Sequence, residues 1–400
     1  MTDSQTQDQQ ASKVDDAITT LLAANDPASM SSEEFRGARY DHGLAWVQFP
    51  EGFGGLGVRP GLQALVEKGM REAGAAPMDP ALFFLVLAGP TIATHGSDEQ
   101  RNRFLRPMFT GEEVWCQLFS EPGAGSDFAG LAASAVRDGD EWTINGQKVW
   151  NTMAHVADWA MLVTRSDPDQ PKHKGMTYFA LDMAGPGVEV RPLYQITGEA
   201  EFNEVYLTNA KVADANRIGA EGEGWRVALT TLMNERSAIG GGSAGKSPVS
   251  ELFSIWEQMA DEVRSAATRD QMMQMYVRSE VLRLTNARAS AAARSGNPGP
   301  EGSVAKLAMA ELNKDLFELA INMMGMAGQV GYDYTLRRPE SLDVAGTNAG
   351  PRHGFLRVRA NSIEGGTSEI MRNILGEQVL GLPGEPRVDK AIPWKEVPRS

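Results

Sequence analysis

Leu118-Phe-Ser-Glu-Pro-Gly-Ala-Gly-Ser-Asp127 is the stretch on which the interpretation of this 400-residue chain depends. Its two glycines and its proline predict a loop that a ligand can approach closely, because glycine carries no side chain to obstruct the approach. From such a loop, Ser120 and Ser126 can donate hydrogen bonds to anionic oxygens. The pattern alone is equally consistent with an ordinary glycine-containing turn, so the neighbouring motifs decide its meaning.

Three further runs follow this one along the chain. Asn145-Gly146 is typical of a tight turn between strands, so the first of these runs predicts a hairpin that presents Trp150 and Thr152 at a strand end. The second run has the composition of a helix, and the third contains a second pair of glycines. The three runs are Asn145-Gly-Gln-Lys-Val-Trp-Asn-Thr152, Leu232-Met-Asn-Glu-Arg-Ser-Ala-Ile-Gly240 and Ile363-Glu-Gly-Gly-Thr-Ser-Glu-Ile-Met-Arg-Asn-Ile374.

The surrounding residues divide the chain into a helical part, a part rich in short strands and a second helical part. In the first part apolar residues recur at spacings of three and four, with a break at Pro50-Glu-Gly-Phe-Gly-Gly55. Helices and strands that are segregated in this way are typical of an α+β fold and not of alternating β-α-β units. The predicted boundaries are 1–12 (disordered tail), 13–110 (N-terminal helical domain), 111–212 (middle β domain), 213–383 (C-terminal helical bundle) and 384–400 (C-terminal tail).

Individual elements follow from the same periodicities. The strands expected in the middle part are Trp142–Ile144, Lys148–Trp150, Trp159–Val163, Thr177–Leu181 and Val188–Val190. The helices expected in the last part are Trp225–Ile239, Pro248–Thr268, Asp270–Arg294, Gly302–Met326 and a final one around Thr367–Val379.

Composition excludes several classes of function. Acidic residues outnumber basic ones by 52 to 38, and the net charge of −14 disfavours nonspecific binding to nucleic acid or to an anionic membrane surface. Cys116 is the only cysteine and the five histidines are dispersed, which argues against a disulfide, a cysteine-based metal cage or a metallohydrolase site. Residues 1–12 do not resemble a secretory signal and no run of 18 apolar residues occurs, so we expect a soluble, cytoplasmic protein.

Two familiar motif patterns occur by chance between the helices of the last part. Gly240–Ser247 fits the phosphate-loop pattern G-x-x-x-x-G-K-[ST], which requires a preceding strand. Gly241–Gly245 fits G-x-S-x-G, which requires a strand-to-helix turn in a parallel sheet and a histidine partner. The stretch from Trp225 onward is helical in pattern and no parallel sheet is indicated, so we interpret the segment as a helix end or a close helix crossing.

Together, the four runs resemble the acyl-CoA dehydrogenase family, and the resemblance extends from about residue 40 to residue 383. It implies a helical N-terminal domain, a β-barrel-like middle domain and a C-terminal four-helix bundle. It also implies an FAD enzyme that oxidises the Cα–Cβ bond of an acyl-CoA to a trans-2-enoyl-CoA, with a carboxylate removing the α-proton and flavin N5 accepting hydride. An electron-transfer flavoprotein is the implied electron acceptor.

The resemblance further assigns roles to individual residues. Trp150 would cover the isoalloxazine ring and Thr152 would form a hydrogen bond near N5. Arg236 would lie near the pantetheine or CoA part of the substrate, although an ion pair on its helix is an alternative role. The other residues implied at the flavin or the nearby ligand are Gln117, Phe119, Ser120, Ser126, Thr367 and Glu369, with Ser126 also contacting substrate.

The catalytic base of the family occupies one of two positions. In many members it directly precedes the Gly-Thr of the last run, where this chain has Gly365, with Glu364 one residue out of register. In the other subgroup it lies on the first long helix of the C-terminal domain and is followed by arginine, as Glu235 is here. We therefore expect Glu235 to be the base, desolvated in a cavity that raises its pKa; an exposed helix glutamate paired with a neighbouring turn is the alternative.

The chain departs from the family pattern where the FAD diphosphate is bound. Family members usually carry Arg-x-x-Phe-Gly there, whereas 260–269 contains only Arg264 and Arg269 as substitutes, and the glycines of 324–331 are rearranged. A homodimer or homotetramer is implied by the family, but a heteromer with a paralogous subunit could supply the missing contacts. In such a heteromer the chain would have little activity alone. A further alternative is that the chain is an acyl-CoA oxidase or a nitroalkane oxidase with the same fold.

Overall fold

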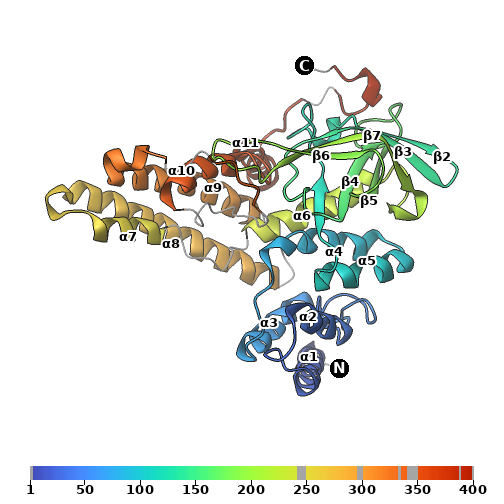
Figure 1. The fold of residues 1–400 in the computed structure, drawn as a ribbon, viewed down its shortest axis with the longest axis horizontal. Helices are drawn as coiled ribbons and strands as arrows, with labels where there is room; N and C mark the ends of the chain where they lie inside the picture. Colours follow the sequence, from blue (N-terminus) through green and yellow to red (C-terminus); the bar gives the residue numbers. More distant parts are fainter. Residues whose placement is uncertain are drawn as a thin grey trace.

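The computed structural model describes residues 3–240, 249–294, 301–331, 335–339, 350–386 and 389–398. Within them the chain forms a group of N-terminal helices, one mixed sheet and a set of long C-terminal helices (Figure 1). The sheet lies beside the N-terminal helices, and α7 and α8 extend away from both (Figure 1). This arrangement confirms the predicted α+β class. Among the described residues, no helix combines the length and apolar character needed to cross a membrane.

The first part of the chain contains five α-helices. Capping boxes start two of them, where Ser31 pairs with Glu34 and Ser97 pairs with Gln100, so that each serine oxygen accepts a backbone N–H at the helix start. The helices are α1 (Asp3–Ala24), α2 (Ser32–Asp41), α3 (Gln63–Glu72), α4 (Leu85–His95) and α5 (Asp98–Thr110).

The disordered tail predicted over residues 1–12 is wrong, because α1 begins at Asp3. The polar residues 7–9 are exposed on a helix whose later turns are anchored by the fully buried side chains of Val14 and Leu21. Glutamine, alanine and lysine are good helix formers, so an anchored helix can extend through a polar stretch that has no core contacts of its own.

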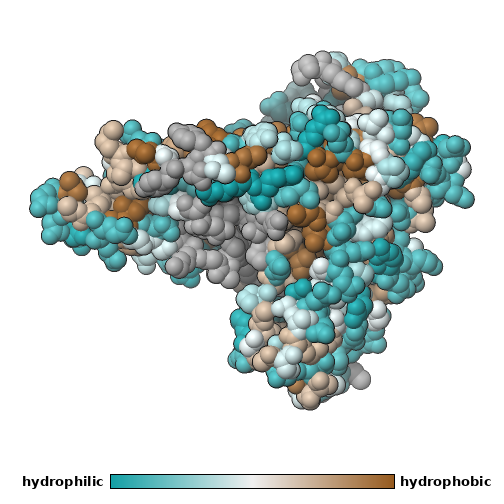
Figure 2. Space-filling view, in the orientation of Figure 1, coloured by the Kyte–Doolittle hydropathy of each residue, from teal (hydrophilic) through white to brown (hydrophobic). Residues whose placement is uncertain are grey.

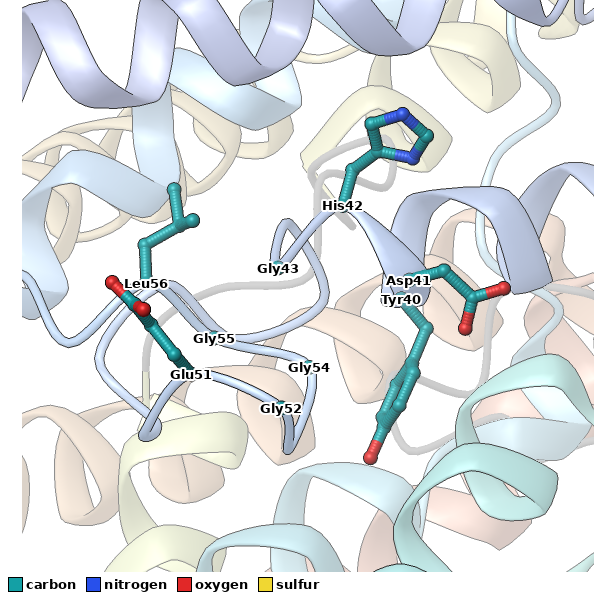
Figure 3. Close-up of a pocket in the computed structure, with 9 residues that line it drawn as sticks. All are labelled: Tyr40, Asp41, His42, Gly43, Glu51, Gly52, Gly54, Gly55 and Leu56. Carbon is teal, nitrogen blue, oxygen red and sulfur yellow. The ribbon is translucent and has the colours of Figure 1, made fainter.

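The predicted break at Pro50–Gly55 is a tight turn that packs against the end of α2. A Cβ on Gly55 would lie 2.1 Å from the carbonyl oxygen of Phe49, so only glycine fits there. With Tyr40, Asp41 and His42, the turn lines a cavity of about 440 Å³ (Figure 3). No residue expected at the cofactor or substrate lines this cavity, so it is not the predicted site.

The middle part folds into an eight-stranded sheet with the order β6-β7-β3-β2-β4-β5-β8, and β1 pairs with β4 off this path. The β1–β4 and β2–β4 pairs are parallel and the others are antiparallel. The strands are β1 (Trp115–Leu118), β2 (Ser134–Asp138), β3 (Glu141–Lys148), β4 (Trp159–Arg165), β5 (Met176–Asp182), β6 (Val188–Pro192), β7 (Asn203–Ala213) and β8 (Arg217–Ile218).

The hairpin predicted at Asn145-Gly146 is also wrong, because β3 continues through both residues. The register with β7 shifts between Ile144 and Gly146, which makes the Asn-Gly pair a β-bulge. Asn145 Oδ1 accepts a hydrogen bond of 2.8 Å from the backbone N–H of Asn209 on β7, and Asn209 has a φ of +52°. This left-handed residue interrupts the alternation of buried and exposed residues in β7, which explains why the sequence pattern did not predict that strand.

The last part is helical, as predicted, and α6 matches the helix expected over Trp225–Ile239. The predicted helix Pro248–Thr268 is wrong in its extent: α7 ends at Gln258, where Arg264 donates to the carbonyl oxygens of Trp256 (3.0 Å) and Glu257 (2.9 Å). Most of the two rejected motif matches, 241–247, lies outside the described residues. The helices are α6 (Gly224–Gly240), α7 (Val249–Gln258), α8 (Ala266–Arg294), α9 (Glu301–Met324), α10 (Pro351–Arg357) and α11 (Ser368–Ile374), followed by the π-helical turn Leu375–Val379.

The bulge makes a specific demand for glycine. A Cβ on Gly146 would lie 2.5 Å from the Cβ of Ala133, so we expect Gly146→Ala to lower the free energy of unfolding by about 1–3 kcal/mol through overpacking. Gly61→Ala is the matched control, because a Cβ there meets no atom within 4 Å. Denaturant unfolding of both variants measures the difference, and equal stability would contradict this account of the bulge.

Candidate functional site

A buried ion pair joins the first two motifs. The fully buried Lys148, at the end of β3, donates from Nζ to Glu121 Oε1 (2.8 Å) and to the carbonyl oxygen of Phe119 (3.0 Å). Glu121 also accepts from the backbone N–H groups of Ala132 (2.7 Å) and Ala133 (2.9 Å). Burial lowers the pKa of Lys148, and the Glu121 carboxylate opposes that shift. The sequence analysis assigned no role to either residue, although both lie inside the quoted motifs.

Trp150 occupies a strained turn directly after this lysine. Its φ is +62°, a left-handed conformation that costs about 1–3 kcal/mol for a non-glycine residue. Its neighbours hold it there: the Val149 N–H donates to the Ser120 carbonyl (2.9 Å), and Asn151 exchanges two backbone hydrogen bonds of 3.0 Å with Asn203. The indole is nonetheless 59% exposed. A strained but exposed aromatic residue is typical of a functional surface.

Asn151 supplies an unsatisfied acceptor beside this tryptophan. Its Nδ2 donates to the Gln117 carbonyl (2.9 Å), whereas its buried Oδ1 has no hydrogen-bond partner among the described residues. A buried acceptor without a donor costs about 1–3 kcal/mol, so a ligand donor is expected there. The flavin ring N–H and the ribityl hydroxyls of FAD are donors of this kind, and the residues present therefore fit an FAD beside Trp150 and Thr152.

Glu235 lies on α6 and reaches the first motif. Gln117 Nε2 on β1 donates to Glu235 Oε2 at 3.4 Å, which places the half-buried carboxylate beside the strand that leads into the Ser120–Ser126 loop. The structure thus brings Gln117, Ser120, the Trp150 turn and Glu235 together.

All three parts of the chain position α6. One turn before Glu235, the buried Thr231 hydroxyl forms hydrogen bonds with Thr91 Oγ1 of α4 (2.9 Å) and with Tyr178 OH of β5 (3.2 Å). Further along the chain, α6 packs against α9 of the C-terminal helices. Hydrophobic surface gathers where the sheet region meets the N-terminal helices (Figure 2), and Leu229 and Met233 of α6 are exposed. An apolar surface beside a carboxylate suits a ligand with an acyl chain.

Glu364, the out-of-register glutamate of the last motif, is engaged in an ion pair. Both of its oxygens accept from the buried Arg357 at 3.2 Å, and Oε1 also accepts from Asn361 Nδ2 at 2.7 Å. Arg357 in turn donates to Glu201 at 3.3 Å, next to the sheet. Burial would lower the pKa of Arg357, but the two carboxylates outweigh it and raise the pKa. Glu364 therefore neutralises a buried cation, which disfavours it as a catalytic base.

The remaining predicted residues differ in what their side chains do. The Phe119 ring is buried and stacks on Phe128 at 5.0 Å, so only its main chain can face a ligand. Ser126 is exposed at the end of the glycine-containing loop, and Thr152 is half-buried beside Asn151. The side chain of Arg236 lies outside the described residues.

Thr367 and Glu369 lie at the start of α11, and the side chains of both bind within that helix. Thr367 Oγ1 caps the helix by accepting from the Ile370 N–H at 3.1 Å. Glu369 is exposed and pairs with Arg372 at 3.2 Å. The hydrogen bonds described above therefore join the first three motifs around Glu235, whereas those of Thr367 and Glu369 remain within α11.

Lys306 on α9 is a buried cation that the sequence analysis missed. It is 1% exposed and donates from Nζ to the Asn361 carbonyl at 2.5 Å. Burial lowers its pKa, and the surrounding carboxylates, Glu364 and Glu235 foremost, oppose that shift. A lysine between Ala305 and Leu307 in an apolar helix was the available signal. It contributes positive charge on the side of α6 that carries the candidate base.

No group of three or more histidine, cysteine, aspartate or glutamate side chains is arranged to hold a metal ion within the described part of the chain. The site geometry accordingly centres on one carboxylate, an exposed indole and hydrogen-bonding loops, an arrangement suited to an organic cofactor.

Domain families of the acyl-CoA dehydrogenases match most of the chain. The acyl-CoA dehydrogenase N-terminal domain family matches residues 4–112, the middle domain family matches 116–210 and the C-terminal domain family matches 222–380.

Individual relatives agree with these matches. Acyl-CoA dehydrogenase FadE34 of Mycobacterium tuberculosis is 39% identical over 363 residues, which make up 90% of this chain and 48% of that protein. The chain therefore spans about half the length of this relative. Acyl-CoA dehydrogenase IpdE1 of the same organism is 36% identical over 349 residues, or 86% of each protein.

Solved structures show the same fold. The ChsE4-ChsE5 complex from Mycobacterium tuberculosis superimposes with a TM-score of 0.69 at 25% identity, covering 95% of this chain and 98% of that one. The Tcur3481-Tcur3483 steroid ACAD gives 0.71 at 22% identity, covering 96% and 99%.

The predicted family, fold and FAD cofactor are thus confirmed by relatives that match along most of this sequence. The chain belongs to the acyl-CoA dehydrogenase family, whose members are FAD-dependent oxidoreductases that act on acyl-CoA.

Proposed function

We propose that the chain catalyses the α,β-dehydrogenation of an acyl-CoA thioester to a trans-2-enoyl-CoA, with Glu235 as the base. The observation that carries this proposal is the hydrogen bond from Gln117 to Glu235, because it sets a carboxylate beside the loop and turn that fit FAD. The ion pair between Glu364 and Arg357 supports it, since it leaves the alternative glutamate committed elsewhere.

The side chains divide the work of the reaction. Bound FAD supplies the hydride acceptor for Cβ. Glu235 removes the α-proton, and Gln117 orients its carboxylate. Trp150 shields the reacting carbons from water by covering the ring system, and Thr152 donates a hydrogen bond next to it. We assign flavin contacts also to Phe119, Ser120, Ser126, Thr367 and Glu369, and contacts with the CoA ester to Ser126 and Arg236.

Glu235→Gln tests the assignment of the base. Loss of a general base lowers turnover by about 10²–10⁴-fold, so we expect a loss of that size with FAD still bound. Glu364→Gln should retain turnover, because its partner is Arg357, and should instead lower stability by leaving that buried cation under-neutralised. Glu223→Gln, before α6 in an exposed pair with Arg226, is the control. Near-normal turnover of Glu235→Gln, measured by flavin bleaching with acyl-CoAs, would refute the assignment.

Trp150→Gly tests separately the backbone strain at Trp150 and the role of its indole in binding FAD. Glycine tolerates the left-handed φ, so the apoprotein should be as stable as the parent or more stable by about 1 kcal/mol. FAD should bind at least about 10-fold more weakly, because the flavin ring can no longer stack on the Trp150 indole. Asn209→Gly, at the left-handed residue of β7, should leave FAD affinity unchanged. Flavin fluorescence titration and apoprotein unfolding give the two readouts, and unaltered FAD affinity in Trp150→Gly would contradict the role.

A heteromer is the second candidate for how the chain functions. Arg264, one of the two possible substitutes for the missing diphosphate arginine, is used to cap α7. The ChsE4-ChsE5 structure is a complex of two named subunits, and FadE34 is about twice as long as this chain. On α8, five exposed hydrophobic side chains recur at helical spacing and support assembly into an oligomer: Met273, Tyr276, Val277, Val281 and Leu284.

We propose a dimer or dimer of dimers, formed by copies of this chain or with a paralogous subunit, that passes electrons to an electron-transfer flavoprotein in the cytoplasm. The proposed substrates are branched or bulky acyl-CoAs, as the helix-borne base suggests and as the steroid relatives support.

Purification of the chain alone distinguishes the two assemblies. If a paralogous subunit completes the diphosphate site, the chain alone should hold clearly less than one FAD per chain. Absorbance at the flavin band, combined with light scattering, measures occupancy and oligomeric state. A homo-oligomer with full, tightly bound FAD would rule out the obligatory heteromer and favour the homo-oligomeric enzyme.

A further inference from the structure

The C-terminal residues 389–398, here called the strap, lie against the sheet region and not against the C-terminal helices that precede them (Figure 1). Main-chain hydrogen bonds fix the strap to the connection between β4 and β5: the Trp394 N–H donates to the Gln170 carbonyl (2.8 Å) and the Lys395 N–H donates to the Pro168 carbonyl (3.1 Å). Pro393 forms a β-bridge with Pro171 beside them. The strap is therefore an ordered part of the fold.

Trp394 fastens the strap to the residues that follow the Glu121–Asp127 loop, here called the ligand loop. Its ring lies over the guanidinium of Arg165, with 4.9 Å between the guanidinium carbon and the ring centroid, and its Nε1 donates to the Gly130 carbonyl (3.3 Å). The buried Arg165 donates to the Ala129 carbonyl (2.6 Å) and to the Lys172 carbonyl (2.9 Å). Trp394 thus covers an arginine that ties the end of the ligand loop to the β4–β5 connection.

Lys172 forms the second attachment. Its Nζ donates to both carboxylate oxygens of Asp127 (2.9 and 3.1 Å) and to Asp389 Oδ2 of the strap (2.5 Å). Burial would lower the pKa of Lys172, but the hydrogen bonds to the two aspartates outweigh it and raise the pKa. The same hydrogen bond lowers the pKa of Asp389. Lys172 and Asp389 are therefore charged at neutral pH, and Lys172 links the strap to the ligand loop by ion pairs with Asp389 and Asp127.

The first half of the ligand loop is fixed, because the buried Ala124 exchanges two backbone hydrogen bonds of 3.0 Å with Glu121. Lys148 holds its first residue, Glu121, and Lys172 holds its last, Asp127. Between them, a Cβ on Gly123 or on Gly125 would meet no atom within 4 Å. The exposed second half of the loop, which carries Ser126, is held at Asp127 by a lysine that also binds Asp389 of the strap.

We propose that the strap is a positioning element for substrate binding: Asp389 and Trp394, acting through Lys172 and Arg165, hold Ser126 and its loop where the acyl-CoA is bound. The inference rests on the proposed function, because it takes the ligand loop as part of the cofactor and substrate site. It assigns to the end of the chain a contribution to KM that lies outside the four motifs. Proton abstraction by Glu235, on α6, does not depend on it.

The test compares three strap variants in the FAD-loaded protein. Asp389→Asn removes one charge from Lys172, Trp394→Ala removes the cover of Arg165, and Lys395→Ala is the control because it removes only an exposed pair with Asp169. We expect KM for acyl-CoA to rise about 3- to 10-fold in the first two, with kcat within about twofold of the parent, as for lost ground-state binding. Asp389→Glu should restore KM, because it restores the charge.

Hydrogen exchange provides a readout that needs no substrate. Amides of residues 123–131 should exchange at least about 10-fold faster in Asp389→Asn and Trp394→Ala than in Lys395→Ala, while the sheet and α6 exchange at parental rates. If this local effect occurs in a protein without dehydrogenase activity, the proposed function fails and the strap remains a loop-positioning element. Unchanged exchange and KM, or acceleration throughout the sheet with a lowered melting temperature, would overturn the proposal.

Discussion

The buried ion pair between Lys148 and Glu121, which belong to two different motifs, is the interaction on which the site depends. Lys148 ends β3 and Glu121 begins the ligand loop, so their ion pair sets both the turn that carries Trp150 and the loop that carries Ser126. Removing one partner of a buried pair leaves an uncompensated charge and costs about 3–5 kcal/mol. Substitution of Lys148 or Glu121 is therefore poorly tolerated. Because this ion pair makes the site rigid, the residues that face the cofactor do not have to do so.

The candidate base depends on a different kind of constraint. Glu235 belongs to α6, which packs against α4, β5 and α9, and the Thr231 hydroxyl makes its two hydrogen bonds to separate parts of the chain. A small displacement of the N-terminal helices relative to the sheet would therefore turn α6 and move the carboxylate away from Gln117. The helices and the sheet together therefore set the distance between Glu235 and the ligand loop. This explains why a site with few reacting groups needs so much of the chain.

The sequence was sufficient to identify the motifs and to predict most of the helices. It was not sufficient where a residue's role depends on a partner far away in the chain. The spacing of apolar residues predicted α6 closely, because that helix buries one continuous face. Asn145-Gly146 was misinterpreted as a turn because its role as a bulge depends on Asn209, sixty-four residues later in the chain. Glu121 and Lys148 lie inside the quoted motifs, but their ion pair could not be predicted, because it forms only when the end of β3 and the ligand loop meet in the folded protein. Likewise, the sequence motif showed that Glu364 is one residue away from the family position of the base. Only the structure shows that Glu364 pairs with Arg357.

The sole thiol of the chain has a practical consequence. Cys116 lies on β1, fully buried, and burial raises the pKa of its thiol, so almost no thiolate is present at neutral pH to react with alkylating reagents. A cysteine introduced at any exposed position would then be the only reactive thiol in the folded protein. The natural sequence is thus already a background for attaching a single spectroscopic probe, without first removing a native cysteine from the sheet.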